Sequence, residues 1–317
     1  MKHGRRRAWI VGGLAAAVLL LWPLVHANQF LLTMATLVLL TLIGATSLHL
    51  VIRTGHFSLG HAAFMGVGGY TCVLTVMKLG VPFALGLLAG AAASGLLALL
   101  IGPVVLRLTG KYFALVTFLL GEIIRMVFVE WVSLTGGSNG IFGVPAPHPA
   151  VESPVGYYYL ALAAAAVCVG LCARILASEV GRAMDAVRES DRVAECSGVP
   201  VIRLKVTVFV IACALVGVQG ALLAHFLRYI DPTAFGMVPS LNLVVMNVIG
   251  GMHHLGGAII GSVFLVALPE LLRGYVELQQ VIFGIVLIVV MAALPGGMVE
   301  VAGRLRRLVA DRAAERS

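Results

Sequence analysis

The sequence predicts an all-α membrane protein, a polytopic bundle of about ten transmembrane helices with broken or re-entrant segments. Of its 317 residues, 60% are hydrophobic and only 11% are charged, and the mean hydropathy is +1.04. A water-soluble domain carries about 25% charged residues, so this chain has too few to cover a surface that faces water. Its apolar runs are instead about 20 residues long, the length that crosses a bilayer as a helix. We therefore expect a single transmembrane domain over residues 1–317.

Ten apolar runs are candidates for membrane crossings. They are Ala8–Ala27, Gln29–Ile52, Ala62–Met77, Val81–Leu106, Tyr112–Val132, Gly156–Leu176, Val206–Phe226, Pro239–Gly251, Gly257–Leu272 and Val276–Leu294. Two of them, Ala62–Met77 and Pro239–Gly251, are short for a full crossing. The first 27 residues also imitate a signal peptide, with a basic start and an apolar core. Because that core is long and many spans follow, we interpret it as a first helix that is retained.

The placement of the basic residues predicts the orientation of the chain. Most of the 22 Lys and Arg residues lie in the head (residues 2–7), in a central polar segment (179–205) and in the tail (296–317). Such residues mark the cytoplasmic side, so we expect this segment and both termini inside. No Lys or Arg lies between Arg125 and Arg174, which places the polar loop there outside. Because the basic residues follow the membrane edges rather than one stripe, the expected contact is membrane lipid and not nucleic acid.

Glycine-rich breaks adjoin both short runs, at Thr54–His61 and Gly250–Gly257. Broken helices inside a bilayer are tolerated only where protein or a water-filled cavity satisfies the freed backbone groups, and transporters place them near the substrate. The alternative is a pair of ordinary loops at the membrane edge, and the sequence leaves both open. On the first interpretation, the breaks and the residues beside them belong to the translocation path or gate: Ser58, Gly60, His61, Asn247, Gly250 and Gly251.

Glu122 and Arg125 lie inside the run Tyr112–Val132, three residues apart and therefore on one helix face. A single charge at the middle of a membrane costs about 2.5–3.5 kcal/mol, so each partner offsets the cost of the other. The pair either lines the path or gate, or joins packed helices without meeting substrate.

Two further glycine patterns carry structural information. Small residues at steps of four form one ridge on a helix, which lets a neighbouring helix approach closely; they are Gly86, Gly90, Ser94, Ala98 and Gly102. The outer loop Thr135–Pro145 is rich in turn formers, among them Gly136, Gly137 and Asn139. Its backbone amides are candidates for binding a small anion, but we favour a turn that touches an external partner.

The polar segment 179–205 is the most informative stretch of the sequence. Read as one helix from Arg182, it has Met184, Val187 and Ala194 on one side and charged residues on the others, until Gly198 and Pro200 end it. Acidic and basic residues alternate at spacings of three, and this pairs Asp185 with Arg188, Glu189 with Arg192, and Arg192 with Glu195. A short amphipathic helix of this kind lies on a membrane or docks into a partner's groove, whereas the alternative is a solvated loop.

Equally informative is what the sequence lacks. It contains no G-x-x-x-x-G-K-[ST] phosphate loop, so if ATP powers this protein, another chain must bind the nucleotide. The histidines have no ligand-like spacing with Cys, Asp or Glu, and the five cysteines fit the role of small packing residues. We therefore expect no catalytic residue, no bound cofactor and no metal in this chain.

The sequence resembles the permeases of high-affinity branched-chain amino acid ABC transporters, whose relatives carry urea or short amides. Four stretches carry the resemblance, in order and over nearly the whole chain: Gly55–Phe64, Tyr112–Arg125 with Leu134–Gly137, Gly181–Val199, and Val248–Gly257. The chain departs from the family pattern at His56, Lys111 and His253–His254, which leaves the substrate open.

This resemblance implies a membrane-spanning permease of an importer in the bacterial inner membrane, translocating leucine, isoleucine, valine or related small solutes. Its implied partners are two cytoplasmic ABC ATPases that hold ATP and Mg²⁺, a second permease subunit, and a periplasmic or extracellular solute-binding protein. The implied contacts with the ATPase come from the central segment: Arg182, Asp185, Arg188, Glu189, Asp191, Arg192, Glu195 and Gly198. The alternative is a secondary transporter or channel driven by an ion gradient. An intramembrane enzyme would need a catalytic constellation that the sequence does not offer.

Overall fold

A computed structural model describes residues 28–272, 279–293 and 297–299. The predicted first span Ala8–Ala27, the basic head and the tail from residue 300 lie outside these residues. The long helices are α2 (Gln29–Arg53), α3 (His61–Leu79), α4 (Phe83–Val105), α5 (Lys111–Glu130), α7 (Pro154–Ala177), α10 (Val201–Leu227), α11 (Met237–Gly250), α12 (Leu255–Leu271) and α13 (Gln279–Ala293). The short helices are α6 (Val132–Thr135), α8 (Glu179–Glu189) and α9 (Asp191–Cys196).

The helices confirm a polytopic membrane bundle. Within the described residues, α2, α3, α4, α5, α7 and α10 are each long and apolar enough to cross a bilayer. Helices α11 and α12 meet that test only as a pair, and they bend by 118° at the break between them. Of the two runs that are short for a crossing, Ala62–Met77 extends to the 19-residue helix α3, whereas Pro239–Gly251 forms α11 with only 14 residues. The described part therefore gives six crossings, or seven with the bent pair, against an expected total of about ten for the whole chain.

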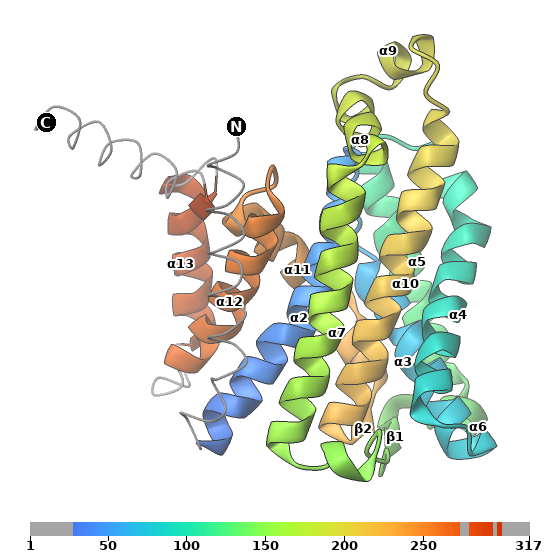
Figure 1. Cartoon of the computed structure of the whole chain (residues 1–317), viewed down its shortest axis with the longest axis vertical. Helices are drawn as coiled ribbons and strands as arrows, with labels where there is room; N and C mark the ends of the chain where they lie inside the picture. Colours follow the sequence, from blue (N-terminus) through green and yellow to red (C-terminus); the bar gives the residue numbers. More distant parts are fainter. Residues whose placement is uncertain (1–27, 273–278, 294–296, 300–317) are drawn as a thin grey trace, which may run out of the picture.

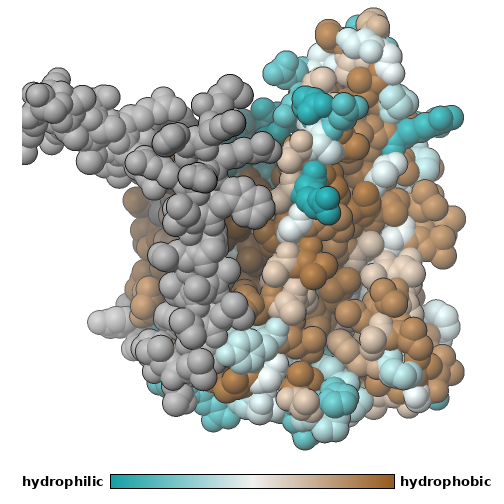
Figure 2. Space-filling view, in the orientation of Figure 1, coloured by the Kyte–Doolittle hydropathy of each residue, from teal (hydrophilic) through white to brown (hydrophobic). Residues whose placement is uncertain are grey.

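Helices α2 and α10 lie at the centre of the bundle. Helix α10 packs against α3, α4 and α2, and α2 also packs against α7 and α12 (Figure 1). Hydrophobic side chains cover the middle of the visible surface, and hydrophilic ones gather toward its two ends (Figure 2). This distribution is the one that a bilayer requires, because the apolar band faces lipid.

The predicted ridge of small residues is the contact surface of α4. All five of its residues are buried, and the hydroxyl of Ser94 donates to the carbonyl of Phe64 in α3 at 2.8 Å. A Cβ on Gly90 would overlap the carbonyl oxygen of Gly68 in α3, and a Cβ on Gly68 would overlap Gly217 in α10. Three helices therefore approach here more closely than larger side chains allow.

The two polar loops lie at opposite ends of the bundle, as the charge pattern predicts (Figure 1). At one end the short strands β1 (Ile141–Phe142) and β2 (Tyr229–Ile230) pair antiparallel, with Ile141 opposite Ile230. The 3₁₀ turns η1 (Gly137–Asn139), η2 (Pro149–Val151) and η3 (Pro232–Phe235) adjoin them in the sequence. Helices α8 and α9 project from the other end.

Candidate functional site

The break between α2 and α3 re-enters the bundle. Helix α2 ends at Arg53, and the amide of Leu59 donates to the hydroxyl of Thr117 in α5 at 3.1 Å. A Cβ on Gly60 would overlap the carbonyl oxygen of Thr117, so this position needs glycine. Thr117 lies six residues into α5, about 9 Å along its axis at 1.5 Å per residue. Helix α3 therefore begins inside the bundle, which favours a broken helix over a loop at the membrane edge.

Beside this break, buried polar side chains from four helices form what we call the polar core. Each of its members is at most 4% exposed: Ser47 and His49 of α2, His61 of α3, Gln219 of α10, and Ser240 and Asn247 of α11. Polar groups at this depth are costly unless they are hydrogen-bonded, and in membrane proteins they mark functional sites.

Asn247 ties α11 to α2 within the polar core. Its amide nitrogen donates to the carbonyls of Ala45 and Leu243, both at 2.9 Å. Its amide oxygen lies 3.2 Å from Nδ1 of His49 and accepts the hydrogen of that ring nitrogen. About two turns earlier in α11, the hydroxyl of Ser240 accepts the amide hydrogen of Ala62 at 3.0 Å and so caps the start of α3.

Several atoms here have no hydrogen-bond partner among the described residues. The hydroxyl of Ser47 donates to the carbonyl of Gly44 at 2.8 Å, so Nε2 of His61 is the donor in its 2.9 Å contact with that hydroxyl. Nδ1 of His61 is then an acceptor, and it has no partner. The same holds for Nε2 of His49, the side-chain oxygen of Gln219 and the hydroxyl of Ser58. These buried groups are available to water or to a polar solute.

The second break, between α11 and α12, depends on close backbone contact. A Cβ on Gly250 would overlap the carbonyl oxygen of Gly257, and Gly251 has a φ of 120°, which other residues rarely adopt. The glycines at 250, 251 and 257 thus permit the sharp bend between the two helices.

The pair Glu122–Arg125 is formed on α5, with Nε of the arginine 2.7 Å from the carboxylate. Both side chains are about 30% exposed: Arg125 at 30% and Glu122 at 28%. Gly236, just before α11, lies close to the pair, because a Cβ added there would come within 3.6 Å of both Glu122 and Arg125. The pair therefore lies beside the start of α11 and keeps one side open at the surface of this chain.

The polar segment 179–205 differs from the single helix that its sequence predicts. Ser190 adopts an extended backbone, ends α8 and accepts the amide of Val193 to start α9. Burial of Met184, Val187 and Ala194 is as predicted, since Val187 and Ala194 pack with Val201 in a small separate core. The break at Ser190 turns α9 back so that these residues share that core.

The ion pairs of α8 and α9 also differ from the expected spacing. Asp185 pairs with Arg53 at the end of α2 rather than with Arg188. Arg188 instead contacts His253 in the second break, with Nη1 and Nδ1 3.0 Å apart. Arg182 pairs with Glu179 at 3.2 Å. The remaining predicted members of this segment are exposed: Glu189, Arg192, Glu195 and Gly198. The segment is therefore joined to both breaks at one end of the bundle.

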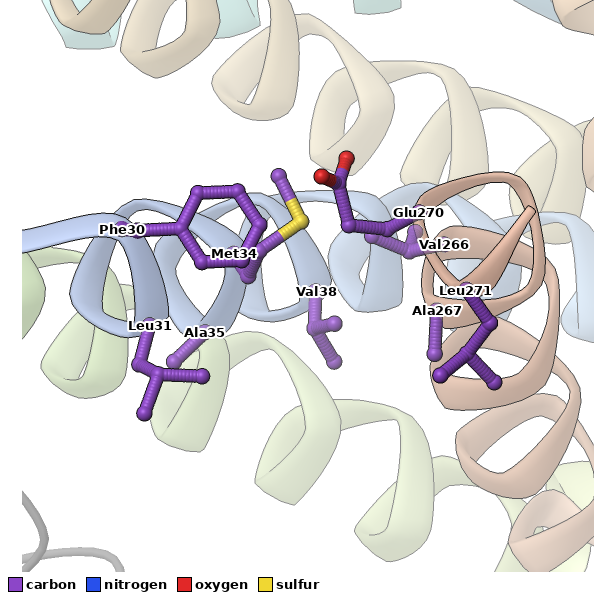
Figure 3. Close-up of a pocket in the computed structure, with 9 residues that line it drawn as sticks. All are labelled: Phe30, Leu31, Met34, Ala35, Val38, Val266, Ala267, Glu270 and Leu271. Atoms are coloured by element: carbon purple, nitrogen blue, oxygen red, sulfur yellow. The ribbon is translucent and has the colours of Figure 1, made fainter. Parts of the chain in front are cut away.

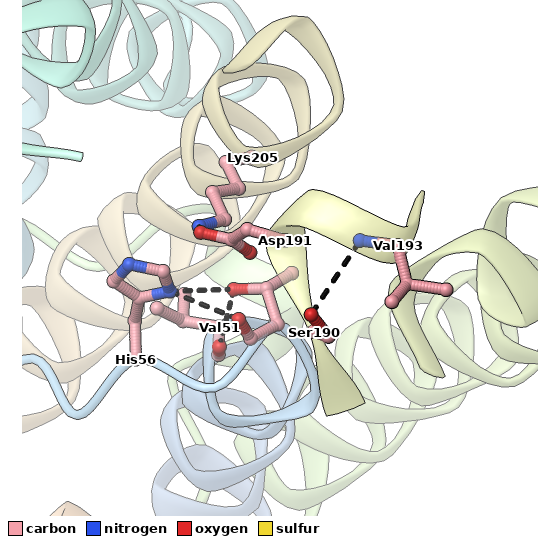
Figure 4. A network of polar contacts seen from close by, with 7 residues as sticks. Val51, His56, Ser190, Asp191, Val193 and Lys205 are labelled. Atoms are coloured by element: carbon pink, nitrogen blue, oxygen red, sulfur yellow. Dashed lines mark hydrogen bonds and ion pairs between the residues drawn. The ribbon is translucent and has the colours of Figure 1, made fainter. Parts of the chain in front are cut away.

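Asp191 has a partner that its spacing does not predict, the buried Lys205 of α10. The two groups are 2.6 Å apart, with Lys205 only 2% exposed (Figure 4). They line a polar cavity of about 260 Å³ together with His56, whose Nδ1 donates to the carbonyl of Thr54 at 3.0 Å. Burial, and next the charge of Lys205, lower the pKa of His56 below its ordinary value.

The loop Thr135–Pro145 is a compact turn. Gly136 and Gly137 have φ values of 78° and 62°, and a Cβ on Gly136 would overlap the carbonyl oxygen of Gly140. The amide of Gly137 donates to the hydroxyl of Thr135 at 3.3 Å, so it is not free to bind an anion. Asn139 is exposed. The loop thus fits the turn that we favoured over an anion site.

A larger groove lies at the side of the bundle, between the start of α2 and the end of α12 (Figure 3). It has a volume of about 580 Å³, and except for Glu270 its lining is apolar, with Phe30, Met34 and Leu271 among the residues. Such a lining cannot replace the water around a charged solute. We therefore place the functional site in the polar core and the breaks rather than here.

The sequence interpretation missed several residues of this site. Ser47, His49, Gln219 and Ser240 are polar residues within predicted membrane-spanning runs, and a polar side chain at such a position is itself a signal of function. Arg53 and Lys205 sit at the ends of such runs and resemble ordinary membrane-edge charges. Asp185, the partner of Arg53, lies far away in the sequence, whereas Asp191 is 14 residues before Lys205.

Known proteins resemble this chain over most of its length. The family model described as branched-chain amino acid transport system / permease component matches residues 30–291. The chain is 28% identical to the high-affinity branched-chain amino acid transport system permease protein LivM of Escherichia coli K12, over 93% of this chain and 75% of that protein. It is 31% identical to the corresponding permease protein LivH of Salmonella typhimurium, over 38% of this chain and 40% of LivH. No solved structure is significantly similar to it. The chain belongs to the family of branched-chain amino acid transport permeases.

Proposed function

We propose that this chain is the membrane-spanning subunit of an ATP-driven importer of branched-chain amino acids. The observation that carries this proposal is the form of the α8–α9 segment. Its inner side is anchored by buried Met184, Val187 and Ala194, and its outer side exposes Arg192, Glu195 and the apolar Val193, which is 65% exposed. A short helical element with a buried inner face and a mixed charged and apolar outer face is suited to dock in a partner's groove.

The partner in this proposal is a pair of cytoplasmic ATPases. They would bind ATP and Mg²⁺, since the sequence has no phosphate loop of its own. The chain itself would act as a transport subunit without catalytic residues or cofactors. The basic segment 179–205 supports a cytoplasmic position for α8 and α9, in the inner membrane of a bacterium and with both termini on the cytoplasmic side.

The proposed translocation path follows α11. Gly236 lies beside Glu122 and Arg125, Asn247 lies in the polar core, and the helix ends at the break after Gly250. A zwitterionic amino acid must exchange its water for polar partners along the way. The unpartnered acceptors near Ser58, Gly60 and His61 are suited to receive its ammonium group or the water around it.

A second permease subunit is proposed to cover the Glu122–Arg125 pair. An ion pair that is about 30% exposed would be costly against lipid, so a protein surface or an aqueous path should face it. The similarity to both LivM and LivH supports two related permeases in one transporter. At the opposite end from α8, the loop with Gly136, Gly137 and Asn139 is proposed to meet an external binding protein.

A charge reversal tests the docking proposal. Glu195→Lys should leave the permease inserted in the membrane but weaken the binding of the ATPases at least severalfold and lower substrate-stimulated ATP hydrolysis. Gly198→Trp should act in the same direction, although Gly198 has a φ of 84°, so a larger side chain also strains the backbone. The matched control is Lys78→Glu at the opposite end of the bundle, which should leave ATPase binding unchanged. Equal ATPase binding by wild type and Glu195→Lys would contradict the proposal.

A further inference from the structure

We propose that Arg53 joins α8 to the backbone of the break between α11 and α12, so that displacement of α8 moves this part of the path. The functional role of this link rests on the proposed function, whereas the link itself is formed by contacts within this chain. Arg53 is a positioning residue, since its ion pair with Asp185 and its hydrogen bond to His253 both lie outside the polar core.

The side chain of Arg53 makes two contacts in different directions. One terminal nitrogen, Nη2, pairs with the carboxylate of Asp185 on α8. The other, Nη1, donates to the backbone carbonyl of His253 at 2.8 Å. A guanidinium holds several N–H donors in one rigid plane, so a single side chain fixes both neighbours at a set separation. With an exposure of only 16%, its charge is largely shielded from water.

A second contact runs parallel to this one. Nη1 of Arg188, one turn along α8 from Asp185, lies 3.0 Å from Nδ1 of His253. Arginine has no acceptor, so the histidine nitrogen accepts. Helix α8 therefore reaches the same residue of the break twice, directly through Arg188 and indirectly through Arg53.

The contact of Arg53 is the more consequential of the two because it holds the backbone. The carbonyl of His253 lies between Gly251 and Gly257, whose backbones are in close contact. A shift of this carbonyl is therefore passed to the ends of α11 and α12 rather than absorbed by a side chain. Asn247 lies three residues before the end of α11 at Gly250, so the polar core begins within one turn of the break.

The experiment measures the distance between α9 and α12 by pulsed electron paramagnetic resonance in the purified full-length chain, without ATPases or nucleotide. One spin label uses Cys196, which is exposed, whereas Cys72, Cys168, Cys172 and Cys213 are buried. The other uses Gly256→Cys on α12, where an added Cβ has open space. We expect a narrow distance distribution in the parent protein and a clearly broader one in Arg53→Ala.

Further variants make the test specific to a bridge. Arg174→Ala removes an exposed arginine at the end of α7 and should leave the distribution narrow. Arg53→Lys keeps the positive charge but lacks the planar set of guanidinium donors, so it should give a distance distribution of intermediate width. This variant replaces Arg53→Ala in the test if the alanine variant cannot be obtained as a folded protein. Because Asp185 acts through Arg53, adding Asp185→Ala to Arg53→Ala should broaden the distribution little further.

The functional consequence is measured separately. Arg53→Ala should bind the ATPases as tightly as the parent protein yet lose about tenfold or more of ATP-driven uptake, equivalent to about 1.4 kcal/mol of coupling free energy. A narrow distribution in Arg53→Ala and Arg53→Lys, or additive effects of Arg53→Ala and Asp185→Ala, would overturn the bridge. If the ATPases do not bind even the parent protein, the proposed function fails, but the distances still decide whether the bridge exists.

Discussion

Asn247 of α11 and His49 of α2 face each other inside the bundle, joined by a hydrogen bond of 3.2 Å between two side chains that are both fully buried. Asn247 is also satisfied at both hydrogens of its amide nitrogen. One residue thus holds the short helix α11 against the central helix α2.

Replacement of Asn247 by alanine should destabilise the protein by about 1–3 kcal/mol, because it leaves the buried carbonyl of Ala45 and the ring of His49 without partners. The measurement is thermal unfolding in detergent, with uptake in proteoliposomes as a second readout. The control is Asn242→Ala on the same helix, where the residue is only half-buried and should matter less. Equal losses in both variants would show that Asn247 has no special structural role.

Gly68→Ala should disrupt the packing of α3 against α10 at a cost of about 1–3 kcal/mol, because its Cβ would overlap the backbone of Gly217. The matched change is Gly170→Ala in α7, where a Cβ meets no atom within 4 Å. That control should be neutral or stabilise the helix by up to about 1 kcal/mol. Unfolding temperatures of the two variants, measured side by side, decide the matter; a harmless Gly68→Ala would contradict the close approach.

Arg125→Ala should harm assembly or transport more than the double change of Arg125→Ala with Glu122→Gln. The single change leaves a carboxylate at membrane depth without its partner, whereas the double change removes both charges. The yield of assembled transporter and its rate of uptake are the readouts. A double variant that performs worse than either single one would mean that the two residues do not act as a pair.

The protein should lose stability as the pH falls below about 6.5, in part through His56. Burial, followed by the charge of Lys205, lowers the pKa of His56 in the folded state below its ordinary value of 6.5. The unfolded chain therefore takes up this proton at a higher pH than the folded one, so the contribution is fully present above 6.5 and is lost as the pH falls below it.

Thermal unfolding at about pH 7.5 and about pH 5.5 measures this effect, since it brackets the range where the unfolded histidine gains its proton. His56→Gln should reduce the drop between the two values. His148→Gln, which changes an exposed histidine directly before η2, serves as the control and should not reduce it. An identical drop in the parent protein and in His56→Gln would contradict the assignment.

Much of the fold follows from the sequence because a bilayer constrains it so strongly. The run Gln29–Ile52 became α2 and the run Val206–Phe226 became most of α10, since a long apolar stretch has few other ways to satisfy its backbone. The ridge from Gly86 to Gly102 likewise identified the contact face of α4, because small residues at steps of four have one evident use.

The arrangement at the ends of the helices could not be derived in the same way. Ser190 is compatible with a helix interior and with a helix cap, and only the shared core of Val187 and Ala194 makes it a cap. Local spacing gave Asp185 the partner Arg188, but the three-dimensional fold brings Arg53 closer. Contacts between residues far apart in the sequence decide such cases, and periodicity carries no information about them.

The most direct test of the account is uptake of radiolabelled leucine into proteoliposomes that contain the purified permeases and an external binding protein. With the ATPases present and ATP supplied to them, leucine should accumulate against its gradient. Without the ATPases, uptake should be absent even when a proton or sodium gradient is imposed. Accumulation driven by an ion gradient alone would contradict an ATP-driven importer and identify a secondary transporter instead.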